Sequence, residues 1–278
     1  FSDPLVGAAG AWAQAVGPGQ IGASRLPQPS DVVFMYQAER AVYEDYGATV
    51  LAWGGTPTPE SLEASRGVAF HGSVGMVTEF AGYHSRFPTT WEAGNVYVID
   101  TYDFYVESPL TIEPGTIVKF HPFDGPMLSL SGSGSLTADG TPGSPIIFTS
   151  FKDDAHGGDT NGDGAASSPA SQDWFRIYTN DLNGCLTCDY CEFYYGGGGA
   201  YTSTLSLSGS NNVSVTHCTF AHNDGSDASG WYAVLEANWG GTGVVIQDNV
   251  FYDNVRPLSI SDRVSLDDSN VFHNPANT

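Results

Sequence analysis

The sequence predicts a mainly β protein, in which a small α/β segment over residues 1–93 is followed by a right-handed parallel β-helix over residues 94–278. Two observations predict this fold: an internal repeat near the C-terminus, and a change in the texture of the sequence at Gly94. The composition agrees, because 34 glycines and a charged fraction of 14% are typical of a turn-rich β protein.

The repeat consists of three segments that superpose without gaps: LTCDYCEFYYGG from Leu186, VSVTHCTFAHN from Val213 and VVIQDNVFYDN from Val244. A weaker copy, VSLDDSNVFHN, starts at Val264. Apolar residues recur at every second position, so each copy fits a strand of one coil, and equivalent residues stack on the next coil. Leu186, Val213 and Val244 fall in one aliphatic column. We expect two further columns: Phe193, Phe220 and Phe251, and Cys191, Cys218 and Asn249.

The α/β segment is predicted from four alternating elements before Gly94. A helix over residues 30–47 starts at a Ser-Asp pair that can cap it, ends at a glycine, and precedes the strand ATVLAW over 48–53. A second helix over 58–67 and a strand over 68–80 follow. We expect this segment to cap the β-helix or to dock it to a partner.

The order of these elements resembles the opening of a barrel-type glycosidase, with Glu79 near a strand end. Four elements are too few to close an eight-stranded barrel, which typically takes about 250 residues. The resemblance therefore does not extend to a complete barrel.

From Gly94 onward, short runs of β-forming residues alternate with turn residues. The phrases NVYVIDTYDFYVESPLTIEPGTIVKF and GSLTADGTPGSPIIFTS, followed by an acidic loop and Asp173-Trp174, resemble the entry coils of secreted microbial right-handed parallel β-helix proteins, the pectate-lyase-like superfold. This resemblance covers about residues 94–274 and implies the fold and secretion. It does not imply an activity, because one fold hosts many functions.

The acidic loop over residues 151–174, FKDDAHGGDTNGDGAASSPASQDW, is too rich in Gly, Ser and Asp to form a helix or a strand. Asp159, Asn161 and Asp163 alternate ahead of a glycine, like the start of the D-x-[DN]-x-[DN]-G calcium loop. A complete calcium-binding hand is excluded, because its twelfth position, which requires Glu, is Ala170.

We therefore predict Ca²⁺ as a cofactor, held in a surface loop, because a cation offsets the repulsion between clustered carboxylates. Asp159, Asn161 and Asp163 are the central ligands, and the shell is completed by Asp173 just before the tryptophan or by Asp153 and Asp154 upstream. The alternative is a solvated acidic turn, in which Asp and Asn cap their own backbone.

The charge balance restricts the classes of partner. With 9 Lys and Arg against 31 Asp and Glu, the formal net charge is −22, which repels nucleic acids and anionic membranes. No apolar run approaches the roughly 20 residues of a membrane span. Acidity with few lysines suits a calcium-containing extracellular medium, so we expect a secreted or cell-surface protein whose signal peptide, if it had one, has been removed.

The four cysteines admit three interpretations. Cys191 and Cys218 share a column, so they either pack as small apolar groups or form a disulfide in an oxidising compartment. The close spacing of Cys185, Cys188 and Cys191 also permits a metal-thiolate site, but alternation along a strand sends neighbouring side chains to opposite faces. Apolar packing is the interpretation that the repeat favours.

Many β-helix proteins cleave polysaccharides, but the sequence lacks the paired-Asp and Gly-His-Gly pattern of polygalacturonase-like hydrolases and the Arg cluster of pectate lyases. The pair Asp267 and Asp268, or the pair Asp153 and Asp154, is a candidate acid and base, and the alternative for both is a solvated turn.

Other candidate contacts for a glycan lie on the outward alternation of the repeats. His217 and His222 point outward there, and an insertion carries further rings that either stack on sugars or close over the core: Trp231, Tyr232 and Trp239. Asn212 begins an N-glycosylation triplet, a short pattern that is frequent by chance.

The leading prediction is a secreted, calcium-binding β-helix that acts as a non-catalytic surface, matrix, adhesive or filament-forming module. The alternative is a carbohydrate-active enzyme, a polysaccharide lyase or glycoside hydrolase, that acts on an extracellular glycan. We expect an extracellular glycan as a partner, and end-to-end self-association through the last coil, because terminal coils carry unpaired backbone groups.

Overall fold

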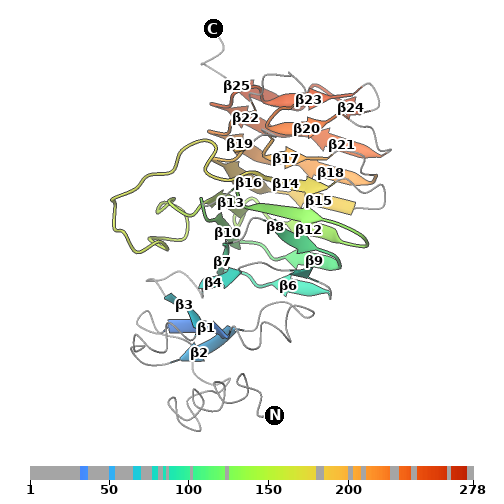
Figure 1. Cartoon of the computed structure of the whole chain (residues 1–278). Coiled ribbons are helices and arrows are strands. Elements are labelled where there is room, and N and C mark those ends of the chain that lie inside the picture. The colour runs from blue at the N-terminus through green and yellow to red at the C-terminus, as the bar shows by residue number, and fades with distance from the viewer. Residues whose placement is uncertain are drawn as a thin grey trace.

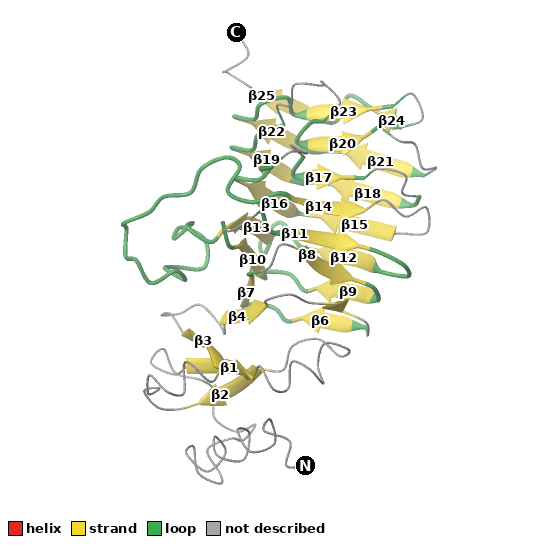
Figure 2. Cartoon of the chain, viewed as in Figure 1, coloured by secondary structure: helices red, strands yellow, loops and turns green. Residues whose placement is uncertain are grey.

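The computed structural model describes residues 88–100, 103–122, 125–179, 185–199, 203–207, 211–225, 232–238, 243–261 and 264–273, together with five strands that precede them. All regular elements in these residues are strands (Figure 2). Within this described part of the chain, no helix has the length and apolar character needed to cross a membrane.

The strands form a right-handed parallel β-helix with three strands in each coil (Figure 1). Coil by coil, the bounds are β4 (Val77–Phe80), β5 (His84–Ser85) and β6 (Thr89–Trp91); β7 (Val96–Ile99), β8 (Asp103–Val106) and β9 (Pro109–Ile112); β10 (Ile117–Phe120), β11 (Met127–Leu130) and β12 (Ser135–Asp139); β13 (Ile146–Ser150), β14 (Arg176–Thr179) and β15 (Cys185–Asp189); β16 (Cys191–Tyr194), β17 (Leu205–Ser206) and β18 (Val213–Thr216); β19 (Thr219–Ala221), β20 (Leu235–Ala237) and β21 (Val244–Gln247); β22 (Val250–Tyr252), β23 (Leu258–Ile260) and β24 (Ser265–Leu266); and finally β25 (Val271–His273).

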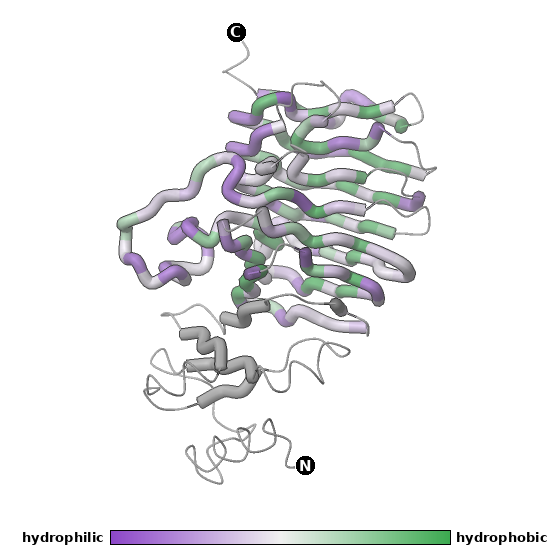
Figure 3. Tube along the Cα trace, viewed as in Figure 1, coloured by the Kyte–Doolittle hydropathy of each residue, from purple (hydrophilic) through white to green (hydrophobic). Residues whose placement is uncertain are grey.

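These strands line up in three parallel sheets, which we name by their end strands. The β4–β25 sheet has eight strands, and the β5–β23 and β6–β24 sheets have seven each. Side chains that point inward fill the space between the sheets, and burial alternates along strands such as β9, β12 and β18. Figure 3 shows hydrophobic and hydrophilic positions along the strands. The fold class predicted from the repeat is confirmed.

The strand register confirms the repeat alignment. Leu186 pairs with Val213, and Val213 pairs with Val244. In the β4–β25 sheet the predicted phenylalanine column extends in both directions, and its neighbouring ring centroids are 4.6 to 5.0 Å apart: Phe148, Phe193, Phe220, Phe251 and Phe272. The fourth copy carries one extra residue before this column, so Phe272 rather than Val271 pairs with Phe251.

The predicted Cys191, Cys218 and Asn249 column lies buried at the bend between the β6–β24 and β4–β25 sheets. All four cysteines of the chain are free thiols, so the column contains no disulfide. The Cys218 thiol donates to the Thr216 carbonyl oxygen at 3.1 Å, and burial raises the pKa of the Cys191 thiol well above its ordinary value. The structure favours the apolar-packing interpretation.

The N-terminal segment differs from the prediction. β1 (Val32–Tyr36), β2 (Val50–Trp53) and β3 (Ser65–Ala69) form an antiparallel sheet with β1 in the centre, and β1 and β3 contact β4 (Figure 1). The predicted helix over 30–47 is wrong at β1, whose sequence VVFMY consists of β-branched and other apolar residues that favour a strand. The predicted strand over 48–53 is confirmed at β2.

The second predicted helix, over 58–67, is wrong where it overlaps β3, and the strand predicted over 68–80 is present in part as β4. Stacking of the coils begins at β4, because Val77 pairs with Val96 in parallel register. The first coil therefore starts ahead of Gly94, where the texture of the sequence changes.

Candidate functional site

The acidic loop leaves the β-helix after β13 and returns at β14, and it projects from the side of the β4–β25 sheet (Figure 1). Its base is fixed by Lys119, a buried residue of β10. The Lys119 Nζ donates to the Asp153 carbonyl oxygen at 2.8 Å, to the Gly158 carbonyl oxygen at 2.7 Å and to Thr160 Oγ1 at 2.6 Å. Burial lowers the pKa of Lys119 to about 8, so its amine is still mainly charged at pH 7. One positive charge therefore lies at the base of the acidic loop.

Three carboxylates of the loop converge. One oxygen each of Asp154, Asp159 and Asp163 lies within 4.8 Å of the others. Asp154 Oδ1 is buried and has no hydrogen-bond partner among the described residues. Burial, with the nearby charge of Asp159 as a second cause, raises the pKa of Asp154. These are the features of a site that would accept a cation.

The other predicted ligands have different partners. Asp153 Oδ2 accepts a hydrogen bond from Thr149 at 2.6 Å and lies 2.6 Å from His156 Nδ1. Burial raises the pKa of Asp153, but the bonds to His156 and Thr149 outweigh it and hold the pKa below its ordinary value. Asp173 Oδ1 lies 2.8 Å from Lys152 Nζ. Neither Asp153 nor Asp173 belongs to the converging group.

The central segment of the loop also bonds to its own backbone, as expected of a solvated acidic turn, and Asn161 Oδ1 accepts from the Asp163 N–H at 3.3 Å, with the two-residue spacing of an Asx turn. Asp159 Oδ1 accepts from the Asp163 backbone N–H at 3.1 Å, and Asp159 Oδ2 accepts from the Gly164 N–H at 2.9 Å. Asn161 donates to Ser167 Oγ at 3.0 Å. The geometry is compatible with a calcium site and with a solvated turn. Asp154 is the residue whose carboxylate, together with Asp159 and Asp163, gives the loop a cation-binding arrangement.

A second arrangement lies on the outer surface of the bend that follows the β4–β25 sheet. Tyr195, His222 and Asp253 occupy equivalent positions in three successive coils, each with a positive φ, of 64°, 58° and 50°. The Tyr195 and His222 rings stack with centroids 5.7 Å apart, and His222 Nδ1 lies 3.7 Å from Asp253 Oδ2. We call this set the Tyr195 column.

A matching set, which we call the Tyr190 column, lies at the other bend of the same sheet. Tyr190 and His217 stack at 4.6 Å, and His217 Nε2 lies 3.8 Å from Asp248 Oδ2. The two outward histidines were predicted from the sequence, whereas the two columns were not. The signal was present, because the Tyr, His and Asp of each column occupy equal positions in the aligned repeats.

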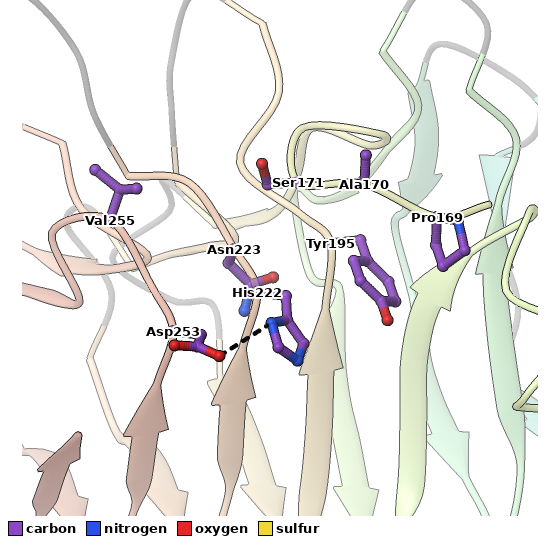
Figure 4. A pocket seen from close by; sticks show the side chains of 8 residues that line it. All are labelled: Pro169, Ala170, Ser171, Tyr195, His222, Asn223, Asp253 and Val255. Carbon is purple, nitrogen blue, oxygen red and sulfur yellow. Dashed lines mark ion pairs between the residues drawn. The ribbon is translucent and has the colours of Figure 1, made fainter. Parts of the chain in front are cut away.

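The Tyr195 column borders a pocket. Residues 169–171 of the returning acidic loop pass beside the column and border with it an open pocket of about 350 Å³ (Figure 4). The pocket is lined by Pro169, Ala170, Ser171, Tyr195, His222, Asn223, Asp253 and Val255. The pocket therefore combines an aromatic ring, an imidazole and a carboxylate on a rigid scaffold.

The pocket has a negative electrostatic environment. Burial raises the pKa of Tyr195, and the charges of Asp153 and Asp173 raise it further. The residue before Tyr195 in the chain, Tyr194, stacks on His156 with ring centroids 5.0 Å apart. Aromatic side chains thus continue from the pocket onto the outer face of the β4–β25 sheet.

The remaining candidates that the structure describes do not gather into a second site. Asp267 accepts hydrogen bonds from Ser269, which lower its pKa, as expected of a solvated turn. Of the insertion rings, Trp231 and Trp239 lie outside the described residues. Asn212 has a φ of 55° at the start of β18.

Comparison with protein-family models, with curated protein sequences and with solved structures finds no match to this chain, so its function is argued from the geometry of the site.

Proposed function

We propose that this protein is a secreted, non-catalytic β-helical surface module that binds an extracellular glycan at the Tyr195 column and holds Ca²⁺ in its acidic loop. The observation that carries the proposal is the pocket itself. Sugars are recognised by rings that pack on their apolar faces and by polar groups that bond their hydroxyls. The Tyr195 column offers both kinds of group along one wall, opposite the loop residues 169–171.

The scaffold supports binding because buried hydrogen bonds fix the backbone from which the pocket side chains project. Asn223, at the base of the pocket, is buried, and its amide donates to the Phe193 and Ala221 carbonyl oxygens at 2.9 and 3.0 Å. Its Oδ1 accepts from the Gly196 N–H at 2.8 Å. A preorganised pocket loses little conformational entropy when a ligand binds.

A carbohydrate-active enzyme is the second candidate, favoured by the pairing of His222 with the Asp253 carboxylate. Glycoside hydrolysis generally uses two carboxylates, about 5 to 9.5 Å apart. Asp253 is the one carboxylate among the residues that line the pocket. This composition supports binding more strongly than bond cleavage.

The experiment is a calorimetric titration with a panel of oligosaccharides, combined with an assay for new reducing ends and for unsaturated products. We expect saturable binding of at least one oligosaccharide with no product formed. Product formation would support the enzyme instead, and the absence of binding across the panel would contradict the proposal.

The calcium part of the proposal rests on the unpartnered Asp154 Oδ1 beside Asp159 and Asp163. We expect millimolar Ca²⁺ to raise the melting temperature, because a ligand that binds only the folded state stabilises it. Asp154→Asn should abolish that rise, whereas Asp139→Asn, an exposed substitution on β12, should preserve it. An equal rise in both variants, or none in the unaltered protein, would argue against this site.

A further inference from the structure

The charges around the Tyr195 column restrict the chemistry of its ligand. The Asp253 side chain is 46% exposed and lies at the pocket wall, with His222 as its neighbour in the column (Figure 4). Asp173 and Asp153 contribute further negative potential at Tyr195. An anionic polysaccharide would therefore meet repulsion in the pocket, whereas a cation would be attracted.

The basic side chains near the pocket are directed to other groups. Lys152 Nζ pairs with Asp173 at 2.8 Å. Arg256 follows the lining residue Val255, but its Nη1 donates to the Tyr232 carbonyl oxygen at 3.3 Å. The residues that line the pocket include neither Lys nor Arg, so His222 is the one side chain of the lining that can pair with the Asp253 carboxylate.

We propose that the pocket selects an amino sugar whose nitrogen is a free ammonium, as in a glucosamine polymer, over neutral and uronic-acid sugars. Asp253 would bind the ammonium of one sugar unit, and the exposed surface of the stacked Tyr195 and His222 rings would pack on the sugar chain, with Tyr195 adding a cation–π attraction. This inference rests on the proposed function, because it names the ligand class of the same pocket.

The Tyr190 column provides a matched control within the same molecule. Asp248 also has a positive φ, also lies beside a histidine, and is 53% exposed. Asparagine adopts positive φ readily, so Asp253→Asn and Asp248→Asn each remove one charge and preserve the backbone. Both variants change the net charge equally, and only Asp253→Asn changes the pocket.

The test compares glucosamine, N-acetylglucosamine and galacturonate oligosaccharides of equal length by calorimetry. We expect the glucosamine oligosaccharide to bind about two- to fivefold more tightly than its acetylated form, as for one partly exposed ion pair. Asp253→Asn should remove this preference, and Asp248→Asn should retain it. Equal melting temperatures of the two variants would show that both are folded.

Three results would overturn the inference. Equal affinity for the charged and acetylated sugars would contradict it and leave the proposed function intact. An equal loss of affinity in the two variants would indicate attraction to the overall charge of −22 rather than to the pocket. If none of the three oligosaccharides binds, this inference fails, and the rest of the panel decides the proposed function.

Discussion

At the scale of single residues, the bends of the β-helix combine a strained backbone with buried side-chain amides that hydrogen-bond to backbone groups. Non-glycine residues with positive φ occur at both bends of the β4–β25 sheet, among them His217 and His222. Such conformations cost free energy and persist where the surrounding structure fixes them. Buried asparagines follow three of these residues and supply this support, as Asn249 does when its Oδ1 accepts from the Cys218 N–H at 2.9 Å.

We expect Asn223→Ala to lower the free energy of unfolding by about 2 to 3 kcal/mol, because the Gly196 N–H and two carbonyl oxygens lose their buried partner. Urea unfolding in the absence of calcium measures this change. Asn161→Ala, on the less buried acidic loop, is the control and should cost less than about 1 kcal/mol. Equal effects of the two substitutions would contradict the supporting role of Asn223.

At the scale of elements, the acidic loop depends on a lysine of β10, a strand that is distant in the sequence but pairs with β13. The Lys119 ammonium bonds to the carbonyl oxygens of residues 153 and 158 and to the side chain of residue 160. The sequence analysis assigned the whole offset of the negative charge to a cation, whereas part of it comes from the chain itself. The loop is therefore a segment fixed at its base by β10.

We expect Lys119→Met to expose the loop to proteolysis between residues 151 and 174 and to destabilise the protein by about 2 to 3 kcal/mol, because charge-assisted hydrogen bonds to the loop are lost. Limited proteolysis with mass spectrometry and urea unfolding measure the two effects. Lys152→Met removes a half-buried ion pair and should change stability by less than about 1 kcal/mol. A loop in Lys119→Met that stays resistant to protease would refute the anchoring role.

The repeated elements were predictable from the sequence, and the site was predictable only in part. Alternation and the phenylalanine column identify the coils, because a shift of one residue would expose the rings. Which of Asp153 and Asp154 lies close to Asp159 and Asp163 was not predictable. It depends on the bonds that Thr149 and Lys119, on neighbouring strands of one sheet, make to Asp153. The helix predicted at β1 failed because a short apolar run fits both periods.

At the scale of the whole molecule, the two ends of the β-helix differ. β4 is contacted by β1 and β3, whereas β25 ends the described strands with Val271 and Phe272 exposed by 42% and 43%. Phe272 continues the buried phenylalanine column onto this surface. End-to-end association of the β-helix remains a prediction, and this surface is where it would occur.

We expect Phe272→Asp to reduce association, because it places a charge in the column at the end of the stack. Light scattering at several protein concentrations, with and without Ca²⁺, measures this effect, and cations should promote association by screening the charge of −22. Val245→Asp is the control, since Val245 is 37% exposed but lies on the side of the β-helix. A monomer under all conditions would contradict the prediction.

The central claim is that the Tyr195 column, and not the general surface of the β-helix, binds a glycan. The most direct measurement is the dissociation constant of the tightest oligosaccharide for two variants, Tyr195→Asn and Tyr190→Asn. Each removes one outward ring at a position with positive φ, of 64° and 47° respectively. We predict that Tyr195→Asn weakens binding about tenfold or more, as for loss of a stacked ring, and that Tyr190→Asn leaves it unchanged. Unchanged binding in Tyr195→Asn, or an equal loss in both variants, would contradict the account.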